Sequence, residues 1–498
     1  MNRVPTILEI CDNPQLFRPW FRKPETWRSW RVFLAALFGL PIKDCEDLGL
    51  FKRCTGLDAP PPGGIVEAWL VCGRRAGKSF VLALVAIYLA VFRDWSTYLA
   101  PGERGVIKII AVDRKQAKVI WRYCHALLTR VQPINAMIER DAPADGEIDL
   151  TNGVTIEVQA ASFRSVRGYT LIAALCDELA FWRSEDSSNP DFEILAALRP
   201  AMSTIPGAML LCASSPYSKR GALYEAHKRY FGRPGPVLVW HADTRTMNPT
   251  VSQRVIDDAM ERDPQSAAAE YGAEWRSDIE TFLSAELVDA AIDRDVIVRP
   301  PQPNINYVAG CDPSGGVGDS FTAAVAHVDC GVIALDALYE KRAPFNPAAA
   351  VGEIADLCRQ YGIRKITGDR YAASWVSEAF AGQQITYWHS QKDRSGVYLD
   401  ALPLFASGKV RLLDNSRLVT QLTGLERRTA PSGKDRVDHS IHGKDDVANA
   451  VCLALVDAQR PEQTALIACP IIIEAPRGFA EFASDGDTYS AYMASIGW

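Results

Sequence analysis

The sequence predicts two α/β domains in tandem, the first on a mostly parallel sheet and the second beginning with three hairpin strands. From Ile65 to Ser214, short apolar runs alternate with helical patterns, which is typical of parallel strands covered by helices. After the proline-rich segment 299–303 the pattern changes to three strands in quick succession, followed by a helix and a strand. A chain of 498 residues is also too long for one hydrophobic core.

The elements follow in order from these patterns. In the first domain we expect strands at 65–72, 105–112, 154–159, 171–176 and 208–214, and helices at 78–92 and 114–128. In the second we expect strands at 307–311, 322–328, 331–339 and 365–369, a helix at 347–361, and a last helix starting near Lys444. The predicted regions are an N-terminal helical region at 1–60, a first α/β core at 61–247, a helical linker at 248–300, a second α/β domain at 301–465 and a loosely held tail at 466–498.

Composition indicates an ordinary soluble protein, with 48% hydrophobic and 23% charged residues. The N-terminus lacks the apolar core of a signal peptide, and the longest apolar run, 80–92, is too short to span a bilayer. The 12 cysteines show no zinc or disulfide spacing, so a cytosolic location is expected. A net charge of −6 gives no support for nucleic-acid binding, but leaves room for a local basic patch.

The segment Cys72-Gly-Arg-Arg-Ala-Gly-Lys-Ser79 follows a predicted strand and begins a helix. Backbone N–H groups of such a loop bind nucleotide phosphates, Lys78 reaches the β- and γ-phosphates, and Ser79 binds Mg²⁺. Cys72 stands where the usual pattern has glycine. The predicted nucleotide-binding residues are Gly73, Arg74, Arg75, Ala76, Gly77, Lys78, Ser79 and Asp177.

A second motif predicts that the bound nucleotide is hydrolysed. The strand 171–176 leads into Asp177 and Glu178. An ATPase needs an acid for Mg²⁺ and a base that orients the attacking water, and these two residues fit those roles. The alternative for the pair alone is an acidic helix cap. The segment Ala213–Pro216 ends another strand and is either a γ-phosphate sensor or a simple strand-to-turn junction.

The arginines of this half have open roles. Arg74 and Arg75 either stabilise transition-state charge at the γ-phosphate or are merely solvated. Arg164 and Arg167 precede the acid-bearing strand and could serve a neighbouring subunit in a ring.

Three separated carboxylates in the second half predict a metal site. Asp312 and Asp369 end strands, and Asp445 and Asp446 precede an apolar helix. Hard oxygen ligands of this kind bind Mg²⁺ or Mn²⁺, which activate water for phosphodiester cleavage. The alternative for each acid alone is a turn residue or a helix cap. The sequence does not decide which of Asp445 and Asp446 is the metal ligand. We favour Asp446 as the ligand and Asp445 as the N-cap of the helix.

Other residues of the second half give weaker indications of a functional role. Two histidines, His439 and His442, are either near the metal or in a surface loop. A basic group could contact phosphates but could equally be a solvated face; it consists of Lys392, Arg394, Arg427, Arg428, Lys434 and Arg436.

The order of these motifs over residues 20–460 resembles the large terminase subunit of tailed bacteriophages. The matching segments are CGRRAGKS, LCDE, ASSP, CDPSGG, ITGDR and HGKDDVANA. The resemblance implies a P-loop ATPase domain followed by a ribonuclease-H-like nuclease domain. It implies catalytic roles for Glu178, Arg74, Asp312, Asp369 and Asp446, with ATP–Mg²⁺ at Ser79 and Asp177 and Mg²⁺ or Mn²⁺ at the three later acids. It also matches Ala213–Pro216 to a motif that couples hydrolysis to domain movement.

The resemblance further implies a motor that moves double-stranded DNA into a procapsid and cuts concatemeric DNA. The implied partners are DNA, a portal protein, a small terminase subunit and further copies in a ring, without a membrane. The implied location is the cytoplasm of a bacterial host rather than the mature virion. Two alternatives remain: an ATP-driven helicase or translocase with an inactive nuclease-like domain, and an adaptor that binds nucleotide without turnover. Weaker still is the match of the segment around Trp27, Trp30 and Arg31 to a region near the adenine.

Overall fold

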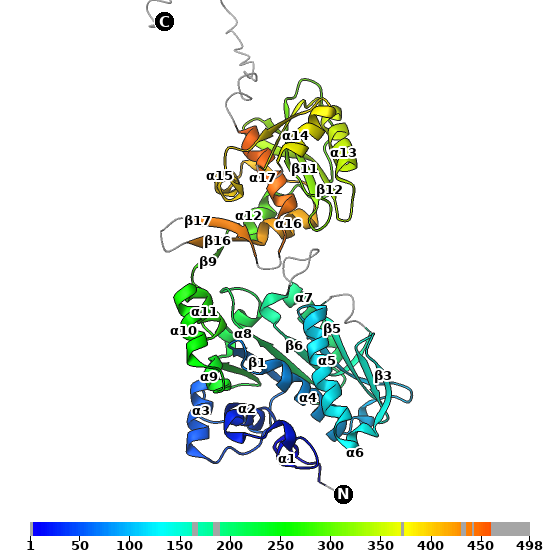
Figure 1. Cartoon of the computed structure of the whole chain (residues 1–498), viewed down its shortest axis with the longest axis vertical. Helices are drawn as coiled ribbons and strands as arrows, with labels where there is room; N and C mark the ends of the chain where they lie inside the picture. Colours follow the sequence, from blue (N-terminus) through cyan, green and yellow to red (C-terminus); the bar gives the residue numbers. More distant parts are fainter. Residues whose placement is uncertain are drawn as a thin grey trace, which may run out of the picture.

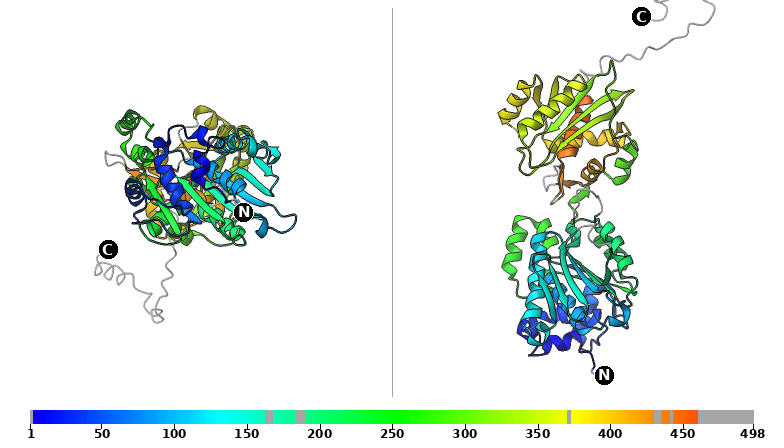
Figure 2. Two further views of the ribbon diagram at one scale, coloured as in Figure 1. Left: turned by 90° about the horizontal axis from the view of Figure 1, so that it is seen from below. Right: turned by 90° about the vertical axis from the view of Figure 1, so that its right-hand side faces the viewer.

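The computed structural model describes residues 3–161, 168–182, 190–369, 373–429, 435–440 and 443–459. Two bodies, each built on its own sheet, lie one above the other, with the N-terminus at the end of the first that points away from the second (Figures 1 and 2). The predicted tail 466–498, Arg164, Arg167, Lys434 and His442 lie outside the described residues.

The first domain is built on an eight-stranded sheet in the order β3-β4-β5-β2-β6-β7-β1-β8. All pairings from β5 to β8 are parallel, whereas β3 and β4 form an antiparallel edge. The strands are β1 (Glu67–Cys72), β2 (Gly105–Ala111), β3 (Ile138–Ala142), β4 (Glu147–Leu150), β5 (Val154–Ala160), β6 (Thr170–Asp177), β7 (Met209–Ser214) and β8 (Val237–Ala242).

Helices cover both faces of this sheet (Figure 1). Helix α4 (Lys78–Phe92) is apolar almost all round and buried, so it lies in the interior between the sheet and the N-terminal helices. The other helices are α1 (Ile7–Asp12), α2 (Arg28–Leu37), α3 (Cys45–Thr55), α5 (Arg114–Thr129), α6 (Gln132–Asn135), α7 (Pro190–Met202), α8 (Ala222–Tyr230), α9 (Thr244–Met247), α10 (Gln253–Arg262) and α11 (Pro264–Glu270). Short 3₁₀ turns occupy Arg18–Trp20, Pro24–Trp27, Ser96–Tyr98 and Leu179–Phe181.

The second domain has a six-stranded sheet in the order β14-β13-β10-β11-β12-β15. Strands β10 to β12 form an antiparallel meander, and β13 and β14 extend it in parallel on the other side of β10. This is the strand order of a ribonuclease-H-like fold. Its strands are β10 (Tyr307–Asp312), β11 (Phe321–Asp329), β12 (Val332–Lys341), β13 (Lys365–Gly368), β14 (Thr386–His389) and β15 (Val410–Arg411).

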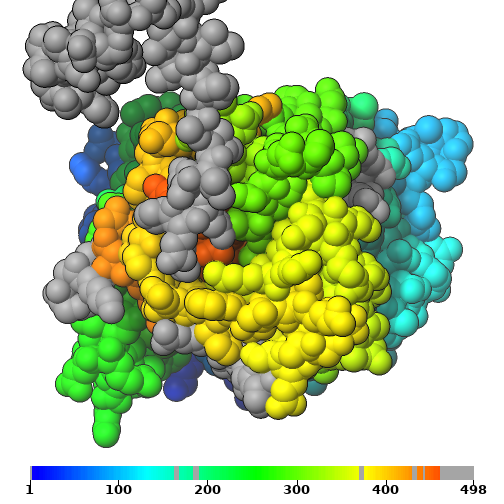
Figure 3. Space-filling view, turned by 90° about the horizontal axis from the view of Figure 1, so that it is seen from above, coloured from blue at the N-terminus to red at the C-terminus, as the bar shows by residue number. Residues whose placement is uncertain are grey.

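Helix α17 (Asp446–Ala458) forms the centre of the second domain. It packs so closely on β10 that a Cβ added at Gly310 would lie 2.5 Å from the carbonyl oxygen of Ala450. In Figure 3 the orange-red α17 shows only as small areas between the yellow and green segments around it. The remaining helices are α12 (Ala285–Ala291), α13 (Pro347–Gln360), α14 (Ala373–Gly382), α15 (Arg394–Ala406) and α16 (Ser416–Thr423).

A small three-stranded sheet lies at the junction of the domains. It joins β9 (Ile279–Thr281) to the hairpin of β16 (Leu425–Thr429) and β17 (Asp435–His439). The segment 248–300, predicted as one helical linker, therefore consists of two parts. In the first part, α10 and α11 pack on each other. In the second part, β9 pairs with the hairpin of the second domain and α12 contacts α15 and α16. Where the independently folding units begin and end stays a prediction.

The predicted fold class is confirmed by the two sheets, and every strand and helix predicted in order is present within a few residues. The predictions missed the edge strands β3 and β4, whose charged residues break the apolar pattern, and also the strands β8, β9, β14, β15, β16 and β17. In the described part of the chain, no helix combines the length and apolarity that a membrane span requires.

Candidate nucleotide and metal sites

The parallel sheet brings the first set of predicted residues to one edge. Strand β7 lies between β1 and β6, and its register pairs Val71 with Ser214 and Asp177 with Ala213. Because these strands are parallel, their carboxyl ends meet at the same edge. The phosphate loop after β1, the acids after β6 and the serines after β7 therefore converge, as a nucleotide site requires.

Lys78 lies at the centre of this convergence and is buried. Its ammonium donates to the carbonyl oxygens of Cys72 and Gly73, both at 3.1 Å, and to Ser215 Oγ at 3.0 Å. Its Nζ also lies 3.4 Å from Glu178 Oε1. Oxygen atoms thus surround a buried positive charge, and nucleotide phosphates would provide the same kind of partner.

The phosphate loop is fastened from outside through three successive carbonyl oxygens. Thr244 Oγ1 donates to the carbonyl of Arg74 at 2.8 Å, Asn248 Nδ2 to that of Arg75 at 2.9 Å, and Trp30 Nε1 to that of Ala76 at 2.7 Å. These bonds turn the carbonyl oxygens of the loop toward its surroundings. Sequence reasoning did not find Thr244 or Asn248, because they lie about 170 residues away along the chain.

Two glycines allow the backbone conformation and the close packing of the phosphate loop. Gly77 has a φ of +102°, a conformation that L side chains rarely adopt. A Cβ at Gly73 would lie 2.2 Å from Thr244 Oγ1. The loop therefore tolerates no side chain where it meets α9. Cys72, the irregular first residue, is the buried last residue of β1 and presents only its carbonyl to Lys78.

Ser79 and Asp177 lie together as the metal-binding role requires. Ser79 Oγ donates to Asp177 Oδ2 at 2.8 Å, and Gln116 Nε2 donates to the same oxygen at 2.9 Å. The other oxygen, Asp177 Oδ1, is buried without a hydrogen-bond partner. Burial, and then the charge of Glu178, raise the pKa of Asp177 to about 6. An unpartnered buried carboxylate oxygen beside a hydroxyl fits the water shell of a Mg²⁺ ion.

Glu178 is held in a left-handed backbone conformation, with φ 51° and ψ 43°. This conformation is unusual for a residue other than glycine and is found at strained functional positions. Glu178 Oε2 accepts from Ser214 Oγ and from the backbone N–H of Ser215, both at 3.2 Å. The carboxylate is therefore fixed between Lys78 and the tip of β7.

The two loop arginines point elsewhere. Arg74 Nη1 pairs with Glu270 Oε1 at 2.9 Å, and its backbone N–H donates to the carbonyl of the same residue. Arg75 has a φ of 64° and is exposed. In this arrangement Arg74 is bound to the end of α11. A role at the γ-phosphate would require it to leave Glu270.

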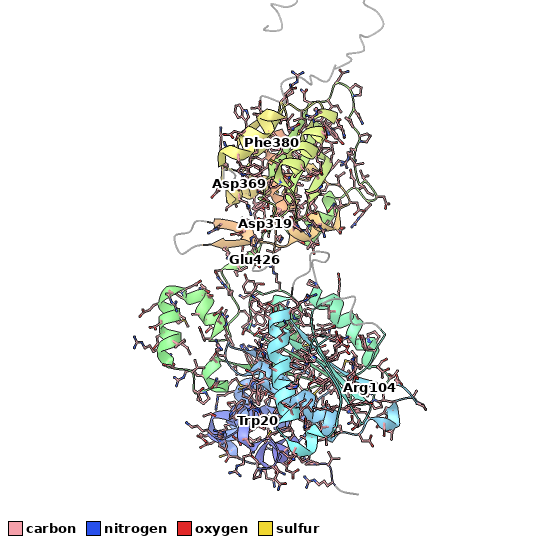
Figure 4. All side chains as sticks on the ribbon, turned by 45° about the vertical axis from the view of Figure 1, so that its right-hand side comes forward. Trp20, Arg104, Asp319, Asp369, Phe380 and Glu426 are labelled. Carbon is pink, nitrogen blue, oxygen red and sulfur yellow. The ribbon has the colours of Figure 1, made fainter. Side chains whose placement is uncertain are left out.

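The second set of predicted residues gathers around a residue that sequence reasoning had placed only in a basic group. Arg394, at the start of α15, lies 3.5 Å from Asp312 Oδ2, 3.9 Å from Asp369 Oδ2 and 2.8 Å from Asp445 Oδ1. One guanidinium group therefore brings acids from β10, β13 and the start of α17 together. Figure 4 labels Asp369 in the upper domain, above Asp319 and Glu426.

Asp445 and Asp446 have different surroundings. Asp445 is at the N-cap of α17 as predicted, but its side chain does not cap the helix. Instead it accepts from Tyr398 at 2.7 Å and pairs with Arg394. Asp446 Oδ2 accepts from the backbone N–H of Ser320 at 3.1 Å. Both carboxylates are buried, so both remain candidates for the third ligand.

Burial raises the pKa of Asp312 to about 7, although the positive charge of Arg394 opposes the rise. Burial also raises the pKa of Asp446. The buried carboxylates of Asp312 and Asp446 fit a divalent cation chemically, because burial removes the solvation that a carboxylate needs. In the described part of the chain, however, no three His, Cys, Asp or Glu side chains are already arranged to share one ion.

The other predicted basic residues of this half are mostly neutralised. Lys392 pairs with Asp400, Arg427 with Asp435, Arg428 with Glu426 and Arg436 with Asp438. His439 borders a cavity of about 480 Å³ between the domains, and its Nδ1 lies 2.9 Å from the carbonyl oxygen of Ser440.

A buried acid joins the two domains. Glu426 of β16 is inaccessible to solvent and accepts from Tyr217 of the first domain at 2.8 Å. Arg220 also pairs with Glu426, which Figure 4 labels at the junction of the two domains. Burial, and then Glu426, raise the pKa of Tyr217 to about 12. Tyr217 follows Ser215 by two residues, so the tip of β7 contacts both Lys78 and the second domain's hairpin.

No family model and no curated protein matches the sequence. Among solved structures, the large terminase of bacteriophage HK97 aligns over 86% of this chain and 100% of that chain, with 15% identity and a TM-score of 0.38. Another large terminase, from a thermophilic bacteriophage, aligns over 87% of this chain and 98% of that chain, with 12% identity and a TM-score of 0.37. The large terminase nuclease of the thermophilic phage G20c aligns over 35% and 96%, with 20% identity and a TM-score of 0.31. At such identities and TM-scores, the likeness alone assigns no function.

Proposed function

We propose that this chain is a viral DNA-packaging ATPase that also cuts DNA with a metal-dependent endonuclease. It would work in the cytoplasm of a bacterial host, in a ring on a portal protein and together with a small terminase subunit. The observation that carries the proposal is that one chain holds two separate acid sites. One surrounds a phosphate-loop lysine, and the other lies on a ribonuclease-H-like sheet.

In the first site, ATP would replace the protein oxygens that now bind Lys78. Bound Mg²⁺ neutralises charge on the phosphates. Ser79 and Asp177 would hold that ion, with Gln116 fixing the orientation of the carboxylate. Glu178, oriented by Ser214 and Ser215, would accept a hydrogen bond from the attacking water. Arg74 would stabilise transition-state charge after leaving Glu270.

The same site has a direct route to the second domain. The hydroxyl of Ser215 binds Lys78, and Tyr217 binds Glu426 of the hairpin. Loss of the γ-phosphate would change the partners of Lys78 and hence of Ser215. The segment 213–217 would carry that change to Glu426, which supports the coupling role that its resemblance implies.

In the second site, Asp312, Asp369 and Asp446 would hold Mg²⁺ or Mn²⁺, with Asp445 as the alternative third ligand. A divalent ion there activates water and stabilises charge on the scissile phosphate. Tyr398 would keep Asp445 in place, and Ser320 would do so for Asp446. Arg394 balances the carboxylates, so it would have to shift when a divalent ion binds them.

Two substitutions test the proposal in a crossed design. Glu178→Gln should lower ATP turnover by about two to three orders of magnitude and leave Mn²⁺-dependent cutting of plasmid DNA unchanged. Asp369→Asn should abolish cutting and leave ATP turnover unchanged. Unchanged turnover in Glu178→Gln would refute the motor, and normal cutting by Asp369→Asn would refute the nuclease.

One observation favours a second candidate, an ATP-driven translocase whose nuclease-like domain is inactive. Arg394 already pairs with three of the acids, so it could be a permanent structural cation. Titration of the metal-free chain with Mn²⁺ separates the two proposals. Binding that Asp369→Asn removes supports the nuclease, and absence of binding supports the translocase.

A further inference from the structure

Helix α5 carries a concentration of positive charge that no function above uses. Between Arg114 and Arg122 the helix has four cations and no acid. All four side chains, those of Arg114, Lys115, Lys118 and Arg122, are exposed. In the part of the chain that the structure describes, none of them forms an ion pair, although the whole protein has a net charge of −6.

The basic residues of the second domain differ from those of α5 because they have acidic partners. The basic group at 392–436 was the predicted phosphate-contacting surface, yet its described members are neutralised by acids. The α5 cations have no such partners. Among these two groups, the described cations of α5 are therefore the ones available for an external anion.

The position of these charges also opposes the stability of the helix. Asp113 is the N-cap, so Arg114 and Lys115 occupy the first turn. Cations there are repelled by the positive end of the helix dipole. Violations of a local rule without a compensating contact are expected mainly at functional or strained positions. The opposite face of α5, which includes Ile120 and Leu127, is buried.

We propose that the exposed face of α5 binds the sugar–phosphate backbone of duplex DNA. Arg114, Lys118 and Arg122 are four residues apart and form a row about 12 Å long, which faces roughly three to four phosphates of one strand. Lys115 lies beside this row. The inference rests on the proposed function, because duplex DNA is the substrate of the motor.

The composition of the face favours DNA over a second copy of the chain. Protein interfaces exclude lysine and charge from their centres, and they gather large apolar side chains there. On α5 the four cations have only two exposed apolar neighbours, Val119 and Tyr123, at 38% and 39% exposure.

The helix also leads to the nucleotide site. Gln116, in the first turn of α5, donates to Asp177 Oδ2 at 2.9 Å and to Ser79 Oγ at 3.2 Å. In Figures 1 and 4 the cyan α5 runs along the near side of the lower domain. DNA bound along this helix would therefore lie next to the residues that respond to ATP.

The test measures binding of a fluorescent 30-base-pair duplex as a function of salt concentration. The α5 variant replaces Arg114, Lys115, Lys118 and Arg122 with glutamine, a good helix former. A control variant makes the same charge change at four paired, exposed arginines. These are Arg140, Arg254, Arg294 and Arg359. All proteins carry Asp369→Asn so that the DNA stays intact.

Removal of four phosphate contacts should reduce the slope of log K against log salt by about 3.6. The affinity advantage of the unsubstituted face should therefore shrink about 150-fold between 50 and 200 mM salt. The control should keep its slope. ATP turnover without DNA should be unchanged in the α5 variant, because none of its four residues belongs to the nucleotide site.

Three outcomes would overturn the inference. The α5 variant could keep the slope, the control could lose as much, or sedimentation could show that the α5 variant alone fails to self-associate while DNA binding is normal. The last result would make α5 a subunit interface. If the chain with an unsubstituted α5 binds no duplex at all, the proposed function fails instead.

Discussion

Replacement of Asp312 with asparagine should stabilise the metal-free second domain at alkaline pH and remove DNA cutting. Asp312 is buried, and its pKa rises from 3.8 to about 7. Between about pH 4 and pH 7 the folded protein therefore keeps a proton that the unfolded chain has lost. Stability falls as pH rises through this window, and the loss is complete above pH 7.

The magnitude follows from that shift of about three pKa units, at about 1.4 kcal/mol each. Ionisation of Asp312 costs the folded state up to about 4 kcal/mol, and asparagine avoids the cost. A change of this size raises the melting temperature of a domain of 150–250 residues by roughly 10 °C. At pH 5 the difference should be only about 2 kcal/mol, because pH 5 lies about one unit above the pKa of 3.8 in the unfolded chain, and it should vanish below pH 4, where the carboxyl is neutral in both states.

Scanning calorimetry at pH 5 and pH 8, with EDTA present, measures this difference. Asp400→Asn is the matched control, because Asp400 pairs with Lys392 at the surface. Its effect should stay within about 1 kcal/mol. If Asp312→Asn melts at or below the original protein at pH 8, the charge of Asp312 is compensated in the fold and the reasoning is wrong.

Three further predictions concern single contacts. Lys78→Ala should abolish ATP turnover and leave metal-dependent cutting intact; parallel loss of both activities in a folded variant would contradict two independent sites. Gly310→Ala should destabilise the second domain by about 1–3 kcal/mol, because its Cβ would lie 2.5 Å from the Ala450 carbonyl, and urea unfolding would measure this. Glu426→Gln leaves Arg220 without its buried charged partner, so the contact between the domains should weaken by about 3–5 kcal/mol. Proteolysis near residue 279 should then become faster. An unchanged cleavage rate would exclude a role of Glu426 at the junction.

The sequence was sufficient for the parts of the sites that lie at the ends of strands. Asp177 and Asp312, at the ends of apolar runs, and Lys78, in the loop after such a run, could be recognised because strand, loop and helix are contiguous in the chain. The parallel register then brings the first two together. The fold class could be predicted for the same reason, since alternation of strand and helix is a local pattern.

Contacts between distant segments could not be predicted. Gln116 reads as an ordinary polar residue of a helix, and only the packing of α5 on α4, β2 and β5 places it on Asp177. Likewise, nothing local distinguishes Arg394 from its basic neighbours. Arg74 was predicted to act at the phosphates and instead binds Glu270, an acid almost two hundred residues away. Its catalytic role stays a prediction.

If the second half of the chain is a metal-dependent nuclease in its own right, it should cut DNA when separated from the first half. The structure indicates where such a segment should begin: β9 starts at Ile279 and pairs with β16, so the segment must begin at about residue 277. The measurement is incubation of residues 277–498 with plasmid DNA and Mn²⁺. We predict cutting that EDTA and Asp369→Asn both abolish. A folded segment that binds Mn²⁺ but leaves the plasmid intact, or one that cuts equally well with Asp369→Asn, would contradict the account.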